Sequence, residues 1–222
     1  MTALTRRATL LGSLAATGAA RAQTASFPDR PDLPAKDVAG LLALAHAQPG
    51  KLNGASAGAG GATHLALELF KSLGKADIVH APYKGGGPAM TDMMASQVDI
   101  YFGGLSTALP HVKAGKMRAL GQTGTARSAA APDIPTIAES GLPGYEAAIS
   151  YGIFLPLGTP AALVDRLHDA VDATIRSPEV AKKFTDLGAD PQFGSPSEFA
   201  AYVAGDFAKW ARLAKEAGLK VE

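Results

Sequence analysis

Strand-like and helix-like segments alternate along residues 37–124, and this alternation restricts the possible folds more than any other feature of the sequence. Strands are predicted over 51–56, 77–82, 98–104 and 116–124, and helices over 38–48, 63–73, 88–96 and 106–111. The connections are short, and each helix returns the chain to the end of the sheet where the preceding strand began. The strands should therefore pair in parallel, in an α/β layer architecture.

Three loops follow these strands, at 57–62, 83–87 and 103–106. In open α/β sheets the ligand crevice lies beyond the carboxyl ends of the strands. We therefore expect the three loops to lie along one edge of the sheet, and their residues are the first candidates for a binding site.

From residue 125 the sequence changes character. Residues 125–145 are rich in proline, glycine and small side chains, which is typical of a segment that crosses the molecule. Residues 147–156 indicate a further strand, and helices are predicted over 160–176 and 178–187. Ser195 and Glu198 form a capping box that opens the last helix.

Two further helix starts are predicted from single polar side chains. Asp37 and Ser106 each precede or open an apolar helical pattern, and short oxygen-bearing side chains are favoured at the N-cap because they accept hydrogen bonds from free backbone N–H groups.

Residues 1–22 have the composition of a signal peptide. Two arginines precede an apolar run over 8–20, and small residues at 20 and 22 predict cleavage before Gln23. The arginine pair fits a twin-arginine signal and an ordinary secretory signal equally, so both stay open. The run is too short to span a bilayer, so we expect an exported protein with no stable membrane insertion after cleavage.

The charge balance argues against nucleic acid as a partner. The chain has 21 Lys and Arg against 20 Asp and Glu, and without the three arginines of the leader 18 bases face 20 acids. There is no basic stripe to neutralise phosphates. The sequence contains no cysteine, which excludes disulfide and thiolate chemistry.

The stretch "SAGAGGATHLALELF", residues 56–70, is the strongest local signal for a binding site. It is not a dinucleotide fingerprint, because Thr63 stands where the third glycine or alanine belongs, and it is not a Walker A loop, because no Gly-Lys-Ser/Thr follows. Two interpretations remain open: an anion cradle made of backbone N–H groups and a helix dipole, or a glycine loop needed only for a tight turn.

Two histidines near this stretch have structural explanations. His64 and Glu68 lie four residues apart on one helical face, but a single pair lacks a third metal ligand, so a local polar pair is the favoured interpretation and no metal site is predicted. His80 lies inside an apolar strand pattern, which favours a satisfied core residue over a ligand.

The other loops offer polar groups as well. Tyr83 and Lys84 precede three glycines, and a hydroxyl, a cation and open backbone suit a carboxylate, although a flexible surface loop has the same composition. "GLSTA" has some likeness to a nucleophile elbow with Ser106 as the nucleophile, but Ala108 replaces the second glycine and no acid-then-histidine order follows. A small serine hydrolase therefore stays an alternative, and a helix cap is the simpler explanation.

The stretches "DIVHAPYKGGGPAMTDMMASQVDIYFGG" and "PDIPTIAESGLPGYEA", together with the flanking sequence from Leu33 to Glu222, resemble the substrate-binding proteins of tripartite tricarboxylate transporters, also called Bug receptors. The resemblance implies a periplasmic protein of the type II binding-protein class, with two α/β lobes of parallel or mixed sheets around a cleft. It further implies a monomer without catalysis or cofactor that captures a small carboxylate for a membrane permease.

The resemblance also implies the ligand-binding residues. These match the family's loops at Ser56, Ala57, Gly58, Gly60, Thr63, His64, Tyr83, Lys84, Gly85 and Ser106. Gly61, Gly103 and Gly104 stand where relatives commonly carry polar side chains, so the identity of the carboxylate does not follow from the resemblance.

One part of the family pattern is absent. Residues 27–31 look like the family's mature start, yet the chain passes directly into "LPAKDV", which belongs at the entry to the second lobe. We therefore expect a truncated first lobe, whose helices expose apolar side chains such as Leu163, Val164, Leu167 and Val171 or repack them elsewhere. The predicted division is a signal peptide at 1–22, a remnant and junction at 23–36, a second lobe at 37–124, and a crossing segment with the C-terminal part of the first lobe at 125–222. A degenerate receptor that cannot bind is a second alternative.

Overall fold

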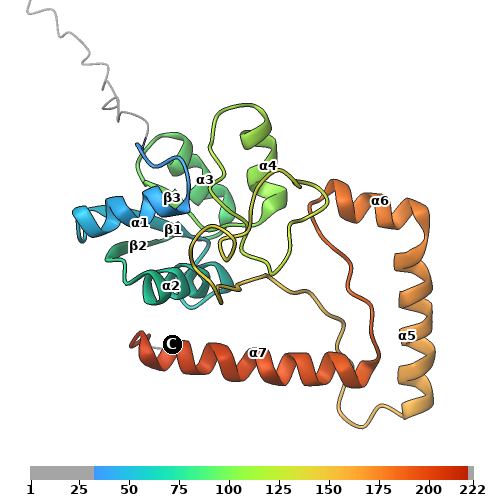
Figure 1. Cartoon of the computed structure of the whole chain (residues 1–222). Helices are drawn as coiled ribbons and strands as arrows, with labels where there is room; N and C mark the ends of the chain where they lie inside the picture. The colour runs from blue at the N-terminus through green and yellow to red at the C-terminus, as the bar shows by residue number, and fades with distance from the viewer. Residues whose placement is uncertain (1–32, 220–222) are drawn as a thin grey trace, which may run out of the picture.

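The computed structural model describes residues 33–219, and its centre is a three-stranded parallel sheet in the order β2-β1-β3. The strands are β1 (Leu52–Ser56), β2 (Ile78–Pro82) and β3 (Ile100–Tyr101). The helices are α1 (Val38–Ala47), α2 (Ala62–Gly74), α3 (Gly86–Met94), α4 (Leu105–Lys113), α5 (Ala161–Arg176), α6 (Pro178–Asp186) and α7 (Pro196–Glu216). Figure 1 shows α1 to α4 gathered around the sheet, with α5, α6 and α7 framing it from outside.

The strand pairing confirms the predicted parallel α/β fold. β1 pairs with β2 from Leu52↔Ile78 to Ser56↔Pro82, and with β3 at Gly54↔Ile100 and Ala55↔Tyr101. Because all the pairs are parallel, the three strands end at the same edge of the sheet. The loops that open α2, α3 and α4 therefore start from that edge.

The core forms where α1 and α2 pack against the sheet. Phe70, Leu67 and Ile78 are almost completely buried there, together with Tyr145 of the crossing segment. The Tyr145 hydroxyl donates to the backbone oxygen of Ala66 at 2.9 Å, so this large side chain is buried with its polar atom satisfied. The crossing segment is thereby attached to α2.

Local capping signals proved reliable at two of three helix starts. The Asp37 carboxylate accepts from the Gly40 N–H at 2.7 Å, and Ser195 with Glu198 forms the predicted capping box of α7. The prediction for Ser106 was wrong. The N-cap of α4 is Gly104, without a side-chain cap, and Ser106 is the second residue of the helix.

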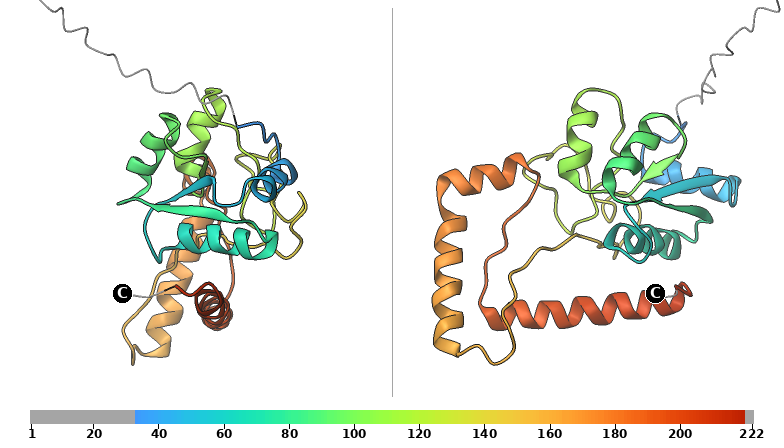
Figure 2. Two further views of the ribbon diagram at one scale, coloured as in Figure 1. Left: turned by 90° about the vertical axis from the view of Figure 1, so that its left-hand side faces the viewer. Right: turned by 180° about the vertical axis from the view of Figure 1, so that it is seen from behind.

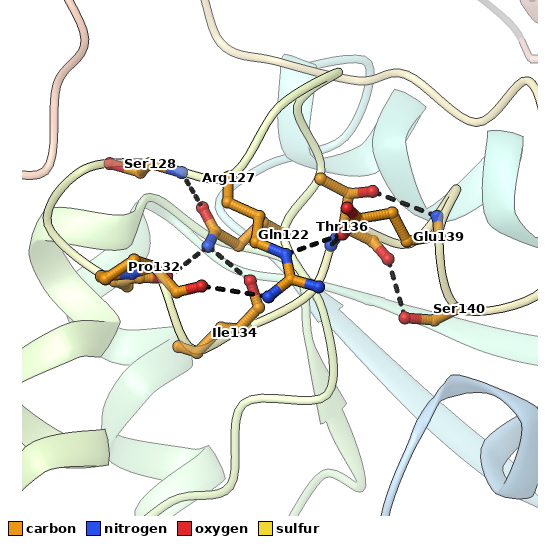
Figure 3. Close-up of polar contacts among 9 residues, drawn as sticks. Gln122, Arg127, Ser128, Pro132, Ile134, Thr136, Glu139 and Ser140 are labelled. Carbon is orange, nitrogen blue, oxygen red and sulfur yellow. Dashed lines mark hydrogen bonds and ion pairs between the residues drawn. The ribbon is translucent and has the colours of Figure 1, made fainter.

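The strand predicted over 116–124 is not formed. Gln122 and Thr136 make one isolated bridge instead. The side-chain amide of Gln122 also forms hydrogen bonds with backbone groups that a neighbouring strand would otherwise bind. It donates to the oxygens of Ala131 and Ile134 at 2.7 and 2.8 Å, and its oxygen accepts from Ser128 N at 2.9 Å (Figure 3). The segment is thus held by the Gln122 side chain and a few backbone bonds, such as Gln122 N–H to Pro135 O, and not by a continuous β-ladder.

The strand predicted over 147–156 is also not formed. Beyond Ala147, whose N–H donates to Thr123 O, the segment up to Pro156 is assigned no strand, and its apolar side chains face solvent. Tyr151 is 91% exposed, and Ile153 and Phe154 are each 68% exposed. The physical reason is that a strand exists only beside a partner, and no neighbouring strand runs here within the described residues.

The C-terminal helices contact the sheet lobe mainly through α7. Trp210 packs against the core, and Lys209 Nζ donates to Glu146 O at 2.6 Å. Neither α5 nor α6 buries a residue, and Leu163 and Leu167 are exposed, as expected. Both views in Figure 2 show α5 standing away from the sheet. Over residues 33–219 none of the helices is long and apolar enough to cross a membrane.

Candidate functional site

The glycine loop, residues 57–61, connects β1 to α2 at the carboxyl edge of the sheet. Gly60 has a φ of +72°, a backbone conformation that side chains rarely adopt, so a glycine is required at this turn. The Ala57 N–H donates to Thr63 Oγ1 at 2.9 Å, and the Gly60 N–H donates to His64 Nδ1 at 2.9 Å. The first turn of α2 thus folds its side chains back onto the loop.

These contacts change which backbone groups a ligand can meet. The Gly58 N–H faces Ser56 Oγ at 3.3 Å, so the loop amides of Ala57, Gly58 and Gly60 are all engaged within the protein. A helix leaves its first N–H groups without intrahelical partners, and the N-cap Gly61 makes no side-chain cap. The donors that this loop presents are therefore the first-turn amides of α2, including those of Thr63 and His64.

A second loop, residues 83–85, lies directly against the glycine loop. The Tyr83 N–H donates to Ser56 O at 3.1 Å and the Gly85 N–H to Ala57 O at 2.9 Å. Gly85 has a φ of +109° and is the N-cap of α3, again without a side-chain cap. The N-cap of α3 is therefore joined to the first residue of the loop that leads into α2.

The side chains of the second loop have different exposures. The Tyr83 hydroxyl donates to Asp92 Oδ2 at 2.8 Å, and burial together with this carboxylate raises the pKa of Tyr83. Lys84 is exposed. The tyrosine thus joins the loop to α3, whereas the lysine projects into solvent, where it can meet an anion.

His64 and His80 form a stacked pair behind the glycine loop. Their ring centroids lie 3.6 Å apart with planes inclined by 9°, and His80 Nε2 lies 2.7 Å from Ser56 Oγ. The sequence predicted a core histidine at position 80, but the half-buried ring faces the loop. The parallel register was the available signal, since it places His80 and Ser56 on the same face of neighbouring strands.

The predicted interpretation of His64 and Glu68 as a local polar pair is confirmed. His64 Nε2 lies 3.6 Å from Glu68 Oε1, and that carboxylate also accepts from Lys71 Nζ at 2.7 Å. No group of three or more His, Cys, Asp or Glu that could hold a metal ion occurs in residues 33–219.

Ser106 lies apart from the two joined loops. It is exposed in the first turn of α4 and lines a hollow of about 2720 Å³ between the sheet lobe and the C-terminal helices. Within the described part of the chain no hydrogen bond joins Ser106 to a histidine. The structure thus brings together the candidates at 56–64 and 83–85, whereas Ser106 lines a hollow to which none of those residues contributes.

The comparisons with known proteins agree with this architecture. Residues 19–219 match the family described as tripartite tricarboxylate transporter family receptor. A protein of Pseudomonas sp. (strain P51), encoded in the tcbD-tcbE intergenic region, is 36% identical over 82% of this chain and 54% of its own length. BugT of Bordetella pertussis is 30% identical over 86% of this chain and 59% of its own length.

A solved structure has the same fold. R. palustris Rpa4515 with adipate has a TM-score of 0.76 and 34% identity, over 85% of this chain and 63% of that one. The chain therefore spans little more than half the length of these curated relatives, and under two thirds of the solved one.

The matching family is described as receptors, and the similar proteins are receptors and not enzymes. The family match covers all the described residues, and the solved relative shares the fold over 85% of this chain. The chain belongs to the family of tripartite tricarboxylate transporter receptors.

Proposed function

We propose that this protein is a periplasmic receptor that binds a small dicarboxylate at the paired N-termini of α2 and α3 and delivers it to a membrane permease. Family membership supports the receptor role, and the adipate in the solved relative supports the ligand class. In this proposal residues 1–22 serve as the export signal. The permease and the particular dicarboxylate are extrapolated from the family.

One observation carries the binding site: the Gly85 N–H to Ala57 O bond joins the glycine N-cap of α3 to the loop that leads into the glycine N-cap of α2. Each helix N-terminus presents free N–H groups and the positive end of the helix dipole, and both favour a carboxylate. No acidic side chain occupies the first turn of either helix, so no built-in anion competes with the ligand.

The candidate residues then have two kinds of role. The amides of Thr63 and His64 and the exposed Lys84 would contact a carboxylate directly. The residues that shape and join the loops are Ser56, Ala57, Gly58, Gly60, Tyr83 and Gly85. Ser106 lines the large hollow, which none of these loop residues lines, and it has no role in this proposal.

We expect the affinity to be low. A hydrogen bond to a charged group contributes about 1.5–3 kcal/mol, and a few such bonds barely exceed the cost of association. The ligand would meet only the loops that this chain retains, since the chain spans 54% to 63% of the length of its relatives. A receptor that has lost binding altogether is the competing outcome of the test.

A substitution at the N-cap of α2 tests the site without disturbing the fold. A Cβ at Gly61 would have 3.6 Å to its nearest neighbour, Gly58 O, and φ at Gly61 is −77°, so a side chain fits. Asp and Asn both cap helices well, so Gly61→Asp and Gly61→Asn should both fold. Only the aspartate repels a carboxylate.

We expect adipate, followed by amide chemical shifts, to perturb Thr63, His64 and Gly86 first. We expect Gly61→Asp to bind adipate at least about tenfold more weakly than Gly61→Asn, since the introduced carboxylate repels the carboxylate of the ligand. The neutral diamide of adipate serves as the control ligand. Because either cap side chain also accepts from the Thr63 or His64 N–H, both variants should bind more weakly than wild type. Adipate affinity of Gly61→Asp equal to that of wild type, or shifts confined to other surfaces, would show that this edge of the sheet is not the binding site.

A further inference from the structure

The glycine loop is held from behind by two histidine rings from different elements. His64 projects from the first turn of α2 and His80 from β2, and their rings stack at a centroid distance of 3.6 Å. His64 is buried and His80 half-buried. The pair therefore forms a single unit between the helix, the strand and the loop.

The bond to His64 determines the protonation state that the loop requires. His64 Nδ1 accepts from the Gly60 N–H at 2.9 Å, so this nitrogen carries no proton. A proton added at Nδ1 would face the amide proton of Gly60 donor to donor. The contact then changes from attractive to repulsive.

The bond to His80 extends the unit to the other end of the loop. Ser56 Oγ lies 2.7 Å from His80 Nε2 and 3.1 Å from Gly58 O, so this hydroxyl contacts both the ring and the turn. Ser56 is completely buried. Through it, His80 is connected to the backbone turn at Gly58.

The surroundings keep both rings neutral near pH 7. Burial lowers the pKa of His64, and Glu68 opposes this at 3.6 Å, while Lys71 engages the same Glu68 carboxylate and adds to the lowering. Burial and then the neighbouring His64 lower the pKa of His80 to about 4. Glu68 and Lys71 on α2 are the charged groups that act on the pair, and the group facing it from β1 is the uncharged Ser56.

We propose that His64 and His80 are positioning residues: as a neutral stacked pair they hold the glycine loop in place beside the α2 N-terminus, and protonation at His64 Nδ1 releases the loop and weakens dicarboxylate binding. The part concerning affinity rests on the proposed function. The part concerning the loop stands on the geometry alone.

The direction of the pH effect follows from the lowered pKa values. In the unfolded chain a histidine takes up its proton near its ordinary value of about 6.5, whereas the folded pair resists protonation. The neutral pair therefore contributes its full stability above that value. The contribution is lost as the pH falls toward about 4, the value to which the pKa of His80 is lowered.

The first test needs no ligand. In the full chain the Gly60 amide shift, recorded from pH 7.5 to pH 4.5, should change together with the His64 ring signals at a midpoint below the ordinary histidine value. In His64→Asn the side-chain oxygen accepts from the Gly60 N–H and cannot titrate, so the Gly60 shift should stay constant. His168→Asn on α5 is the matched control and should follow the wild-type curve. If the wild-type His64 ring titrates and the Gly60 amide shift does not change with pH, the proposal is overturned. This outcome is measured on the wild-type chain and does not require that the variants fold.

The second test uses adipate in calorimetry at pH 7.5 and pH 5. The ligand's own protonation weakens binding to every variant, so His64→Asn measures that part. We expect wild type to lose about tenfold more affinity than His64→Asn, the equivalent of one hydrogen bond. Equal losses, or tighter wild-type binding in acid, would overturn the link to affinity. No adipate binding at any pH would refute the proposed function, and the Gly60 titration would still decide the role of the pair in the loop.

Discussion

At Gln122 one side chain satisfies two carbonyl oxygens and one amide of a segment that has no regular secondary structure. The neighbouring Arg127 donates to Glu139 Oε2 at 3.0 Å, and Glu139 in turn accepts from Thr136 N at 2.7 Å (Figure 3). These contacts, with the salt-linked arginine, lower the pKa of Glu139. The crossing segment therefore depends on individual polar side chains.

Replacing Gln122 by methionine should destabilise the protein by about 2–4 kcal/mol. Methionine has a similar length, but it removes the bonds of the side-chain amide to Ala131 O, Ile134 O and Ser128 N, and only Ala131 O keeps another donor, the Ile134 N–H. Urea unfolding followed by circular dichroism measures the loss. The exposed Gln192 offers a control, and Gln192→Met should be nearly neutral. Equal stabilities of the two variants would contradict the structural role of Gln122.

At the scale of elements, the approach of α2 to the sheet depends on Gly54 in β1. A Cβ at Gly54 would lie 2.9 Å from the buried Leu67 side chain and 3.3 Å from Ile78. The absent side chain thus lets the helix pack closely against the strand that ends at the glycine loop. The position of the candidate site is set by this packing.

Gly54→Ala should therefore cost about 1–3 kcal/mol by overpacking. Gly205→Ala supplies the opposite case, because it lies in α7 with no atom within 4 Å of the new Cβ and should stabilise the helix by about 0.5–1 kcal/mol. Thermal unfolding of both variants tests the pair. Stabilisation by both substitutions would show that a Cβ at Gly54 fits between β1 and α2 without overpacking.

At the scale of the whole molecule, stability should be unevenly distributed. The buried side chains gather between α1, α2 and the sheet, whereas α5 and α6 bury none. The segment 147–156 and the helices after it leave large apolar side chains in solvent, which adds little to stability and favours association with other apolar surfaces. The expectation of a monomer and the boundary at residue 124 stay predictions.

Amide hydrogen exchange should report this difference directly. Amides of β1 and α2 should exchange slowly, because they open only with the core, whereas amides of α5 and α6 should exchange orders of magnitude faster through local opening. Trp210 and Leu213 contact the core, so α7 should be intermediate. Uniform protection from α1 to α7 would mean that the C-terminal helices are stabilised by contacts not seen here.

Sequence patterns that extend over only a few residues were sufficient to predict much of the fold. The alternation of apolar patterns predicted the strands β1 and β2, their parallel pairing and the helices from α1 to α7. The cap at Asp37 could be predicted because its hydrogen bond lies within the first turn of α1. The two strands that failed, at 116–124 and 147–156, each required a partner from elsewhere in the chain. A local pattern can indicate that a segment is able to form a strand, but not that another strand will lie beside it.

The candidate site shows the same division. The glycines and the helix starts were readable from the sequence, because a positive φ and a missing side chain are local properties. Only the tertiary structure decided that the loop amides bond to Thr63 and His64, that His80 stacks on His64, and that Ser106 lines a hollow to which none of the other candidates contributes. The reason is physical: these contacts join residues from separate elements, and their distances are set by how α2 and β2 pack against β1.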